Sequence, residues 1–268
     1  MVERKIIGIM LVQNEDLYIE NALSNILEFC DKVIVADNMS SDHTADKVHA
    51  LMAHNNKIEY YMIQRPIMSH DLISRYAGDD VWIFAVDGDE LYDPSGLALM
   101  RKKIMEGKFD DHWMIFGNVL NCVELNLDSK FAKGYLAPPC RSMTKLYNFS
   151  VINLWSGPCP ERLHGGTIKF RPGFKKTDRF YMYKEVQWED SFFRCLHLCF
   201  LPRSSKEKNS GNERVIRKNI ADQLSEGVLD KLKLGIIRLL GRQQESLWKR
   251  EKYMQGELVQ KNINSFRI

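Results

Sequence analysis

One stretch of the sequence, residues 81–90, constrains the fold more than any other. It reads Val-Trp-Ile-Phe-Ala-Val-Asp-Gly-Asp-Glu, an apolar run rich in β-branched and aromatic residues that ends abruptly in three carboxylates. A short apolar run bounded by a turn is typical of a strand buried on both faces, as in a parallel sheet. We therefore expect an α/β fold in which this strand is central and the acidic turn follows its carboxyl end.

The carboxylates of this turn predict a metal site. Open α/β sheets bind their ligands beyond the carboxyl ends of the strands. Asp87 and Asp89 are spaced so that both can reach one hard cation, which prefers oxygen ligands and leaves room for phosphate oxygens. The alternative is an acidic turn after a core strand, since Pro94 and Gly96 show that the chain turns nearby.

Strand and helix patterns alternate through the first hundred residues. The repeat is about 25 residues, which predicts βαβ units, right-handed crossovers and a mostly parallel sheet flanked by helices. After Pro94 a helix is expected to run to about Glu106, and shorter strands follow it. The expected strands are 6–12, 32–36, 58–63 and 81–87, and later 112–125 and 143–155; the expected early helices begin near residues 15, 40 and 69.

Charge and composition bound the partners. The net charge of +3 is too small to indicate nucleic acid. Residues 206–268 hold 14 Lys and Arg against 8 Asp and Glu, so this segment is basic; it indicates either a solvated helical face or contact with an anionic partner such as a membrane surface. No secretory signal and no apolar run of membrane-spanning length is evident, which favours the cytoplasm, with peripheral contact at the inner face of the membrane as a further option.

Two nucleotide-binding fingerprints are missing. Neither G-x-G-x-x-G after the first strand nor G-x-x-x-x-G-K-[ST] is present, so dinucleotide and P-loop folds are excluded. Instead, residues 12–15 (Val-Gln-Asn-Glu), 33–44 (ending Asp-Asn-Met-Ser-Ser-Asp-His-Thr) and 85–90 (Ala-Val-Asp-Gly-Asp-Glu) resemble, in order, the motifs of family 2 glycosyltransferases of the GT-A fold. The resemblance is strong over residues 5–95 and weaker at 196–204, where Leu-His-Leu precedes Pro-Arg-Ser.

The resemblance implies roles for individual residues. Asn14 and Glu15 would line the nucleoside pocket, and Asp37 would contact the base, with uracil favoured. Asp87 would contact ribose and diphosphate, and Asp89 and His197, with Asp87, would bind Mn²⁺ or Mg²⁺. Arg75 would contact phosphate, although its segment lacks the family's usual A-R-N pattern.

Inverting glycosyl transfer also needs a base for the acceptor hydroxyl. The resemblance implies a carboxylate from the second half of the chain. We expect Asp190, with Glu189 as the alternative and Glu161 as a further candidate; the acidic residues at 189–190 could instead mark a helix amino terminus. The turn-rich loop with Glu161 and His164 could contact the acceptor. Trp188 could stack on a sugar or belong to the core.

The expected organisation is one GT-A-like catalytic domain at 1–205, with a nucleotide-binding half (1–95) and an acceptor half (96–205), and a basic helical extension at 206–268 that could mediate a homodimer or membrane contact. The expected function is metal-dependent transfer from a nucleotide-sugar, with a UDP-sugar favoured. The alternatives are a haloacid-dehalogenase-type phosphohydrolase, in which Asp87 would attack phosphorus, and a non-catalytic GT-A-like binding module.

Overall fold

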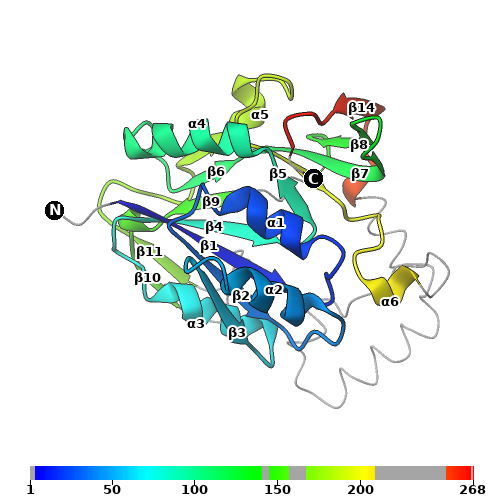
Figure 1. Ribbon diagram of the computed structural model, residues 1–268. Helices are drawn as coiled ribbons and strands as arrows, with labels where there is room; N and C mark the ends of the chain where they lie inside the picture. Colours follow the sequence, from blue (N-terminus) through cyan, green and yellow to red (C-terminus); the bar gives the residue numbers. More distant parts are fainter. Residues whose placement is uncertain (1–3, 141–144, 157–166, 209–251, 267) are drawn as a thin grey trace, which may run out of the picture.

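The computed structural model describes residues 4–140, 145–156, 167–208, 252–266 and 268. Its centre is a seven-stranded sheet of strand order β12-β6-β9-β4-β1-β2-β3, with helices on both faces (Figure 1). The pairs β4-β1, β1-β2, β2-β3 and β12-β6 are parallel, and only β9 runs against its two neighbours. The mostly parallel sheet and its flanking helices are as the sequence predicts. The strands are β1 (Lys5–Val12), β2 (Lys32–Asp37), β3 (Ile58–Met62), β4 (Val81–Asp87), β6 (Met114–Phe116), β9 (Lys145–Asn148) and β12 (Arg179–Tyr181).

Each strand of the central sheet divides its side chains between two hydrophobic clusters. In β1, Ile6 and Met10 face one cluster, whereas Ile7 and Ile9 face the other. This alternation follows from the two-residue period of a strand, and it explains why the predicted strands are continuous apolar runs. Strand β4 is buried along its length up to Asp87, which confirms the expected central strand.

The first cluster lies under α1, α2 and α4, and the second lies under α3 and the hairpin of β10 and β11 (Figure 1). Helix α4 begins at Pro94 as predicted, and Asp93 caps it by accepting hydrogen bonds from the backbone N–H groups of Ser95 and Gly96. The bounds are α1 (Ile19–Ile26), α2 (Thr44–Met52), α3 (Ser69–Ser74) after the 3₁₀ turn η1 (Pro66–Met68), α4 (Pro94–Met105), η2 (Phe149–Val151), β10 (Ile152–Ser156) and β11 (Thr167–Phe170).

A second, five-stranded sheet of order β14-β8-β7-β13-β5 packs beside the first. Its strand β5 follows the acidic turn after β4 directly, so the turn joins the two sheets. The bounds are β5 (Glu90–Tyr92), β7 (Asn118–Asn126), β8 (Phe131–Ala137), β13 (Arg194–His197) and β14 (Leu258–Asn262); the short helices α5 (Met182–Glu185) and α6 (Ser205–Lys208) precede and follow β13.

The expectation of a purely helical extension at 206–268 is wrong at its end. Strand β14 pairs antiparallel with β8 and forms one edge of the second sheet, so residues 258–262 belong to that sheet. Its alternating exposed and half-buried residues explain why it carries little apolar signal in the sequence. Residues 209–251, which hold the apolar helical pattern and most of the basic residues, lie outside the described residues.

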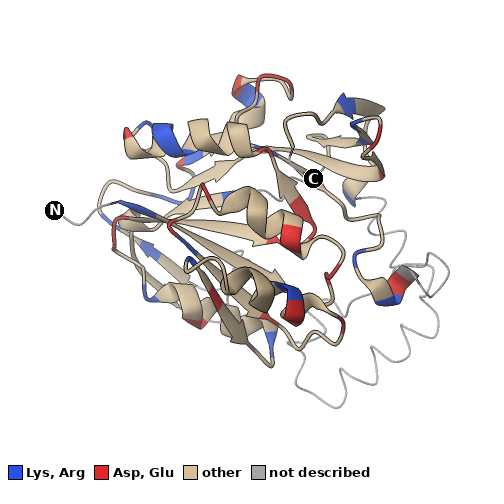
Figure 2. Cartoon of the chain, viewed as in Figure 1, with Lys and Arg blue, Asp and Glu red and all other residues tan. Residues whose placement is uncertain are grey.

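Charged side chains of both signs are interspersed over the described elements (Figure 2). None of the described helices combines the length and the apolar character needed to cross a bilayer.

Candidate active site

Three neighbouring strands of the central sheet end in register at one edge. Asp87 at the end of β4 pairs with Leu11 of β1, and Asp37 at the end of β2 pairs with Val12 of the same strand. The ends of β4 and β2 are therefore two strand spacings apart, about 10 Å between the backbones. The structure thus brings Asp37, Asp87 and the loop after β1 to the edge where a nucleotide can lie across the strand ends.

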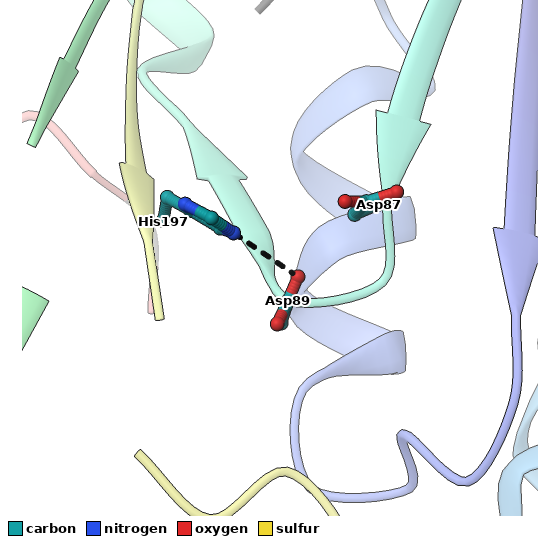
Figure 3. A group of neighbouring side chains, drawn as sticks. All are labelled: Asp87, Asp89 and His197. Atoms are coloured by element: carbon teal, nitrogen blue, oxygen red, sulfur yellow. Dashed lines mark ion pairs between the residues drawn. The ribbon is translucent and has the colours of Figure 1, made fainter. Parts of the chain in front are cut away.

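Asp87, Asp89 and His197 form a metal-binding group in the described part of the chain. One potential ligand atom from each residue lies within 4.8 Å of the others. Asp87 and Asp89 flank the turn after β4, and the His197 imidazole reaches toward Asp89 from the neighbouring strand (Figure 3). Asp89 and His197 are nearly inaccessible to solvent, whereas Asp87 is half-buried. Two carboxylates and an imidazole suit Mn²⁺ and related divalent ions, and Mg²⁺ would prefer more oxygen ligands.

The third carboxylate of the turn, Glu90, has a structural position. It is fully buried, and its Oε2 accepts hydrogen bonds from the Asp87 backbone N–H at 3.2 Å and from the Tyr92 hydroxyl at 3.1 Å. Burial, reinforced by the charge of Asp89, raises the pKa of Glu90 well above its ordinary value. Glu90 therefore fixes the backbone of the turn and leaves Asp87 and Asp89 to face the ligand.

The loops after β1 and β2 are joined by the side chain of Asn14. Its backbone has a φ of 55°, a left-handed conformation that Asn tolerates, and its Oδ1 accepts hydrogen bonds from the backbone N–H of Ser41 at 2.7 Å and of Asp42 at 3.3 Å. Asn14 thus shapes this edge, and helix α1 begins later, at Ile19. Met39 in the second loop also has a positive φ and is 54% exposed, a strained apolar position beside Asp37.

Asp37 is buried and oriented by two donors. Its Oδ1 accepts a hydrogen bond from the Ser40 backbone N–H at 2.8 Å, and its Oδ2 accepts one from the Tyr60 hydroxyl at 2.7 Å. Burial and then the hydrogen bond to this carboxylate raise the pKa of Tyr60, which keeps the hydroxyl protonated as a donor. A carboxylate accepts more than two hydrogen bonds, so Asp37 retains capacity for a base N–H.

Glu15 lies against the acidic turn, and Gly88 makes this possible. A Cβ built on Gly88 would stand 1.9 Å from the Glu15 Oε2, so only glycine allows the side chain to approach so closely. The opposite oxygen of Glu15 faces a guanidinium: Arg203 Nη1 lies 3.5 Å from Glu15 Oε1 and 3.9 Å from Asp89 Oδ2. Arg203 is 5% exposed. Arg203 was recognised in the sequence only as part of a Pro-Arg-Ser motif, without a role.

The segment 203–206 follows β13 of the second sheet and is hydrogen-bonded to the loops after β1 and β2. Each of its residues contacts one of the two loops, which places the whole segment beside the carboxyl ends of β1 and β2. The contacts are Leu17 N–H to Arg203 O (3.0 Å), Ser204 Oγ to Asp42 Oδ2 (2.6 Å), Ser205 N–H to Asp16 Oδ1 (2.7 Å) and Lys206 Nζ to Ser41 Oγ (2.9 Å).

Arg75 does not belong to this site. It caps the carboxyl end of α3, is exposed, and donates a hydrogen bond from Nη2 to the Tyr76 hydroxyl at 3.1 Å. Its charged neighbours include Glu59, which pairs with Lys32 at the first residue of β2. Because α3 runs antiparallel to the strands, Arg75 lies at the amino-terminal edge of the sheet. The structure therefore does not bring Arg75 to the metal-binding group.

The predicted base residues Glu189 and Asp190 lie at the other end of β13 from His197. Arg194, the first residue of β13, donates from Nη1 to the Glu189 carbonyl at 3.0 Å and pairs with Asp93 at the far end of β5. Both acids are exposed, and a hydrogen bond from Lys261 lowers the pKa of Glu189. The structure does not bring either acid to the metal-binding group, because the whole of strand β13 intervenes.

Of the predicted acceptor residues, Trp188 alone lies in the described part of the chain. Trp188 is 3% exposed, and its ring stacks on Phe266 at 6.3 Å and lies under Arg194, so most of the side chain packs within the fold. Glu161 and His164 lie outside the described residues, in the connection between β10 and β11.

Comparison with protein families gives a match that covers more than half of the chain. Residues 9–154 match glycosyl transferase family 2, a range that contains the loops after β1 and β2 and the Asp87–Asp89 turn. His197 and the segment 203–206 lie beyond it. No curated protein matches the sequence.

Solved structures show weak similarity. A mannosyltransferase from Pyrobaculum calidifontis, in complex with GDP-Man and Mn²⁺, is 17% identical; the alignment covers 46% of this chain and 37% of that one, with a TM-score of 0.34. Glucosyl-3-phosphoglycerate synthase from Mycobacterium tuberculosis, with Mn²⁺, UDP-glucose and phosphoglyceric acid, is 17% identical, with coverage of 42% and 43% and a TM-score of 0.33. A 4-diphosphocytidyl-2C-methyl-D-erythritol synthase from Anaerococcus prevotii is 11% identical, with coverage of 55% and 71% and a TM-score of 0.35. The chain thus spans less than half of the two glycosyltransferases.

Proposed function

Because the chain belongs to glycosyl transferase family 2, we propose that it transfers a sugar from a nucleotide-sugar to an acceptor in a metal-dependent reaction. The observation that carries this proposal is the convergence of Asp87, Asp89 and His197 at the carboxyl edge of the sheet, beside the buried carboxylate of Asp37. The group of Asp87, Asp89 and His197 can hold a divalent ion with a diphosphate, and Asp37 can hold the base.

The residues that would hold the ion are Asp89, His197 and Asp87. When bound, a divalent ion neutralises charge on a departing diphosphate without a proton transfer. The rest of the reaction depends on the chain: Asn14 and Asp37 orient the nucleoside, and Glu15 with Arg203 forms a buried charge pair beside Asp89. Arg203 would also offer N–H donors to phosphate oxygens, in the role predicted for Arg75.

We propose a UDP-sugar as donor and inversion at the anomeric carbon. Asp37, whose two oxygens are oriented by Ser40 and Tyr60, can accept the N–H of uracil. Inversion needs a base on the acceptor side. Since Glu189 and Asp190 lie at the far end of β13, Glu161 is the carboxylate we propose for this role.

From the sequence we also propose a cytoplasmic location and a role for the basic segment 206–268 in membrane contact or dimer formation. Most of that segment, residues 209–251, lies outside the described part of the chain. The match to glycosyl transferase family 2 favours the transferase over the phosphohydrolase alternative.

The proposal is tested by thermal shift with UDP, GDP, CMP and dTDP, each with and without Mn²⁺. We expect UDP with Mn²⁺ to give the largest increase in melting temperature. Asp89→Asn should remove the metal-dependent part of that increase, and Asp71→Asn, a change of an exposed carboxylate on α3, should leave it intact. An equal shift in Asp89→Asn and wild type would contradict the metal assignment.

Slow hydrolysis of the donor separates an enzyme from a binding module. A UDP-sugar incubated with Mn²⁺ and wild-type protein should release UDP, which is measured by chromatography. Binding without release from any of a panel of nucleotide-sugars would favour the non-catalytic alternative. Release of inorganic phosphate, together with an aspartyl adduct on Asp87, would favour the phosphohydrolase.

A further inference from the structure

Asn121 connects His197 to the neighbouring strand of the second sheet. It lies in β7 between β8 and β13, directly opposite Tyr135 on one side and His197 on the other. Its side chain is fully buried, so water cannot replace the hydrogen bonds that it makes. Asn121 lies within the range that matches the family model, residues 9–154, and none of the sequence motifs that resemble the family includes it.

The orientation of the Asn121 amide is fixed by its two partners. Its Nδ2 donates to the Tyr135 backbone carbonyl at 3.3 Å, and its Oδ1 lies 2.8 Å from the His197 Nδ1. A carbonyl oxygen can only accept, so the amide nitrogen must face Tyr135 and the amide oxygen must face the histidine. The reversed amide would place two acceptors against each other in a buried site.

An amide oxygen opposite Nδ1 decides where the imidazole carries its proton. In a neutral ring one nitrogen is a donor and the other an acceptor, and the nitrogen facing an acceptor is the donor. Nδ1 lies 2.8 Å from the amide oxygen, whereas Nε2 lies 3.9 Å from Asp89 Oδ1, beyond hydrogen-bond distance; this geometry favours a neutral ring with its proton on Nδ1 and its lone pair on Nε2. A metal ion can bind only to a nitrogen with a free lone pair.

We propose that Asn121 is a positioning residue for the metal site: it holds His197 in the tautomer whose Nε2 can bind a divalent ion beside Asp89. The inference rests on the metal-dependent function proposed above, although the tautomer is a property of the metal-free protein. Tyr253 supports the same arrangement, because its ring packs on the imidazole at 5.4 Å and 80° and limits ring rotation.

The first test uses the metal-free wild-type protein. Long-range ¹⁵N–¹H NMR of the labelled histidines, recorded at about pH 8.5, about two units above the pKa of an unperturbed histidine, reports which nitrogen carries the proton. Comparison with His197→Gln identifies the His197 signal. We expect the tautomer protonated on Nδ1. A ring protonated on Nε2 would overturn the proposal, whatever the enzyme transfers.

The second test uses variants with Mn²⁺ binding measured by the electron paramagnetic resonance of the free ion. Asn121→Leu removes the acceptor at similar volume, and we expect about a tenfold or greater loss of Mn²⁺ affinity, with the Nε2-protonated tautomer populated. Asn121→Asp keeps an acceptor toward Nδ1 and should recover most of the affinity. Wild-type tautomer and affinity in Asn121→Leu would contradict the proposal.

A matched control lies on the same strand. Asn118 is also buried in β7, but it stands opposite Arg194 at the other end of β13. Asn118→Leu should leave the tautomer of His197 unchanged and the Mn²⁺ affinity within about twofold. If Asn121→Leu does not fold, the proposal is tested by the His197 tautomer in the wild-type protein and by the Mn²⁺ affinity of Asn121→Asp. If wild-type protein protonated on Nδ1 binds no Mn²⁺, the metal-dependent function has failed while the tautomer assignment holds.

Discussion

His197 Nε2 lies 3.9 Å from Asp89 Oδ1, although the two residues are far apart in the sequence. The contact follows from backbone pairing: β13 runs antiparallel to β5, and the Leu198 N–H donates to the Asp89 carbonyl at 2.9 Å. The acidic turn after β4 and the histidine are thus held by one hydrogen-bonded ladder. Metal affinity should accordingly depend on how the second sheet is held, as well as on the ligands themselves.

Replacing Asp190 with Asn should leave the rate of sugar transfer within about twofold of wild type, because Asp190 is exposed beyond the amino end of β13, away from the metal-binding group. Glu161→Gln, the removal of the base that we propose instead, should lower the rate by a factor of about 10² or more. The measurement is UDP release with the acceptor present. A large loss in Asp190→Asn alone would show that this acid reaches the acceptor.

Replacing Arg203 with Met should lower the free energy of unfolding by about 3 kcal/mol, since it leaves the buried carboxylates of Glu15 and Asp89 without their counter-charge. Urea unfolding of the metal-free protein measures this. Lys206→Met, an exposed change three residues later, should cost less than about 0.5 kcal/mol. The double variant Arg203→Met/Glu15→Gln should regain part of the loss, and strict additivity of the two changes would contradict the charge pairing.

Replacing Tyr253 with Ala should weaken Mn²⁺ binding several-fold, because the ring that packs on His197 is lost. Phe266→Ala provides the control in the same C-terminal segment: its ring stacks on Trp188, at the opposite end of β13 from His197. Phe266→Ala should lower stability by about 3 kcal/mol yet preserve Mn²⁺ affinity. Equal Mn²⁺ affinities in Tyr253→Ala and wild type would show that the C-terminal segment does not support the metal site.

The pKa of Asp42 predicts a contribution to stability that is lost in acid. Burial acts to raise this pKa, but hydrogen bonds from the Ser204 and Thr44 hydroxyls and from backbone N–H groups lower it overall below its ordinary value of 3.8. A carboxyl with a lowered folded pKa stabilises the fold above its unfolded pKa, and the contribution disappears as pH falls through the folded pKa. Asp42→Asn should therefore cost about 1 kcal/mol at neutral pH and less below pH 3.8. Urea unfolding as a function of pH measures the difference; equal costs at both pH values would contradict it.

Local signals predicted the central sheet well. The runs that became β1, β2 and β4 are apolar on both faces, so their identity as buried parallel strands needs no knowledge of the rest of the chain. The carboxylates Asp37 and Asp87 follow from the same argument, because parallel strands that are joined by right-handed crossovers end at one edge.

The second sheet was harder to predict. Its edge strand β14 is half exposed and polar, and its pairing with β8 spans more than a hundred residues, so neither periodicity nor spacing indicates it. The misplacement of Arg75 and of the two acids before β13 has a related cause. The type of a residue and its order in the chain do not show at which edge of the sheet the residue lies. That position depends on the direction in which its helix or strand runs.

The sequence by itself determined the amino-terminal part of the fold: the alternating strands and helices, the acidic turn after β4 and the polar loops after β1 and β2. These features are local, because they depend on side-chain patterns within a few residues of each strand. Only the tertiary structure decided that Arg203 lies beside Glu15 and Asp89, that Asn121 orients His197 and that Tyr253 packs on its ring. Those contacts join β7, β13 and the chain end across large sequence separations, and they arise from strand pairing and burial that no short segment encodes.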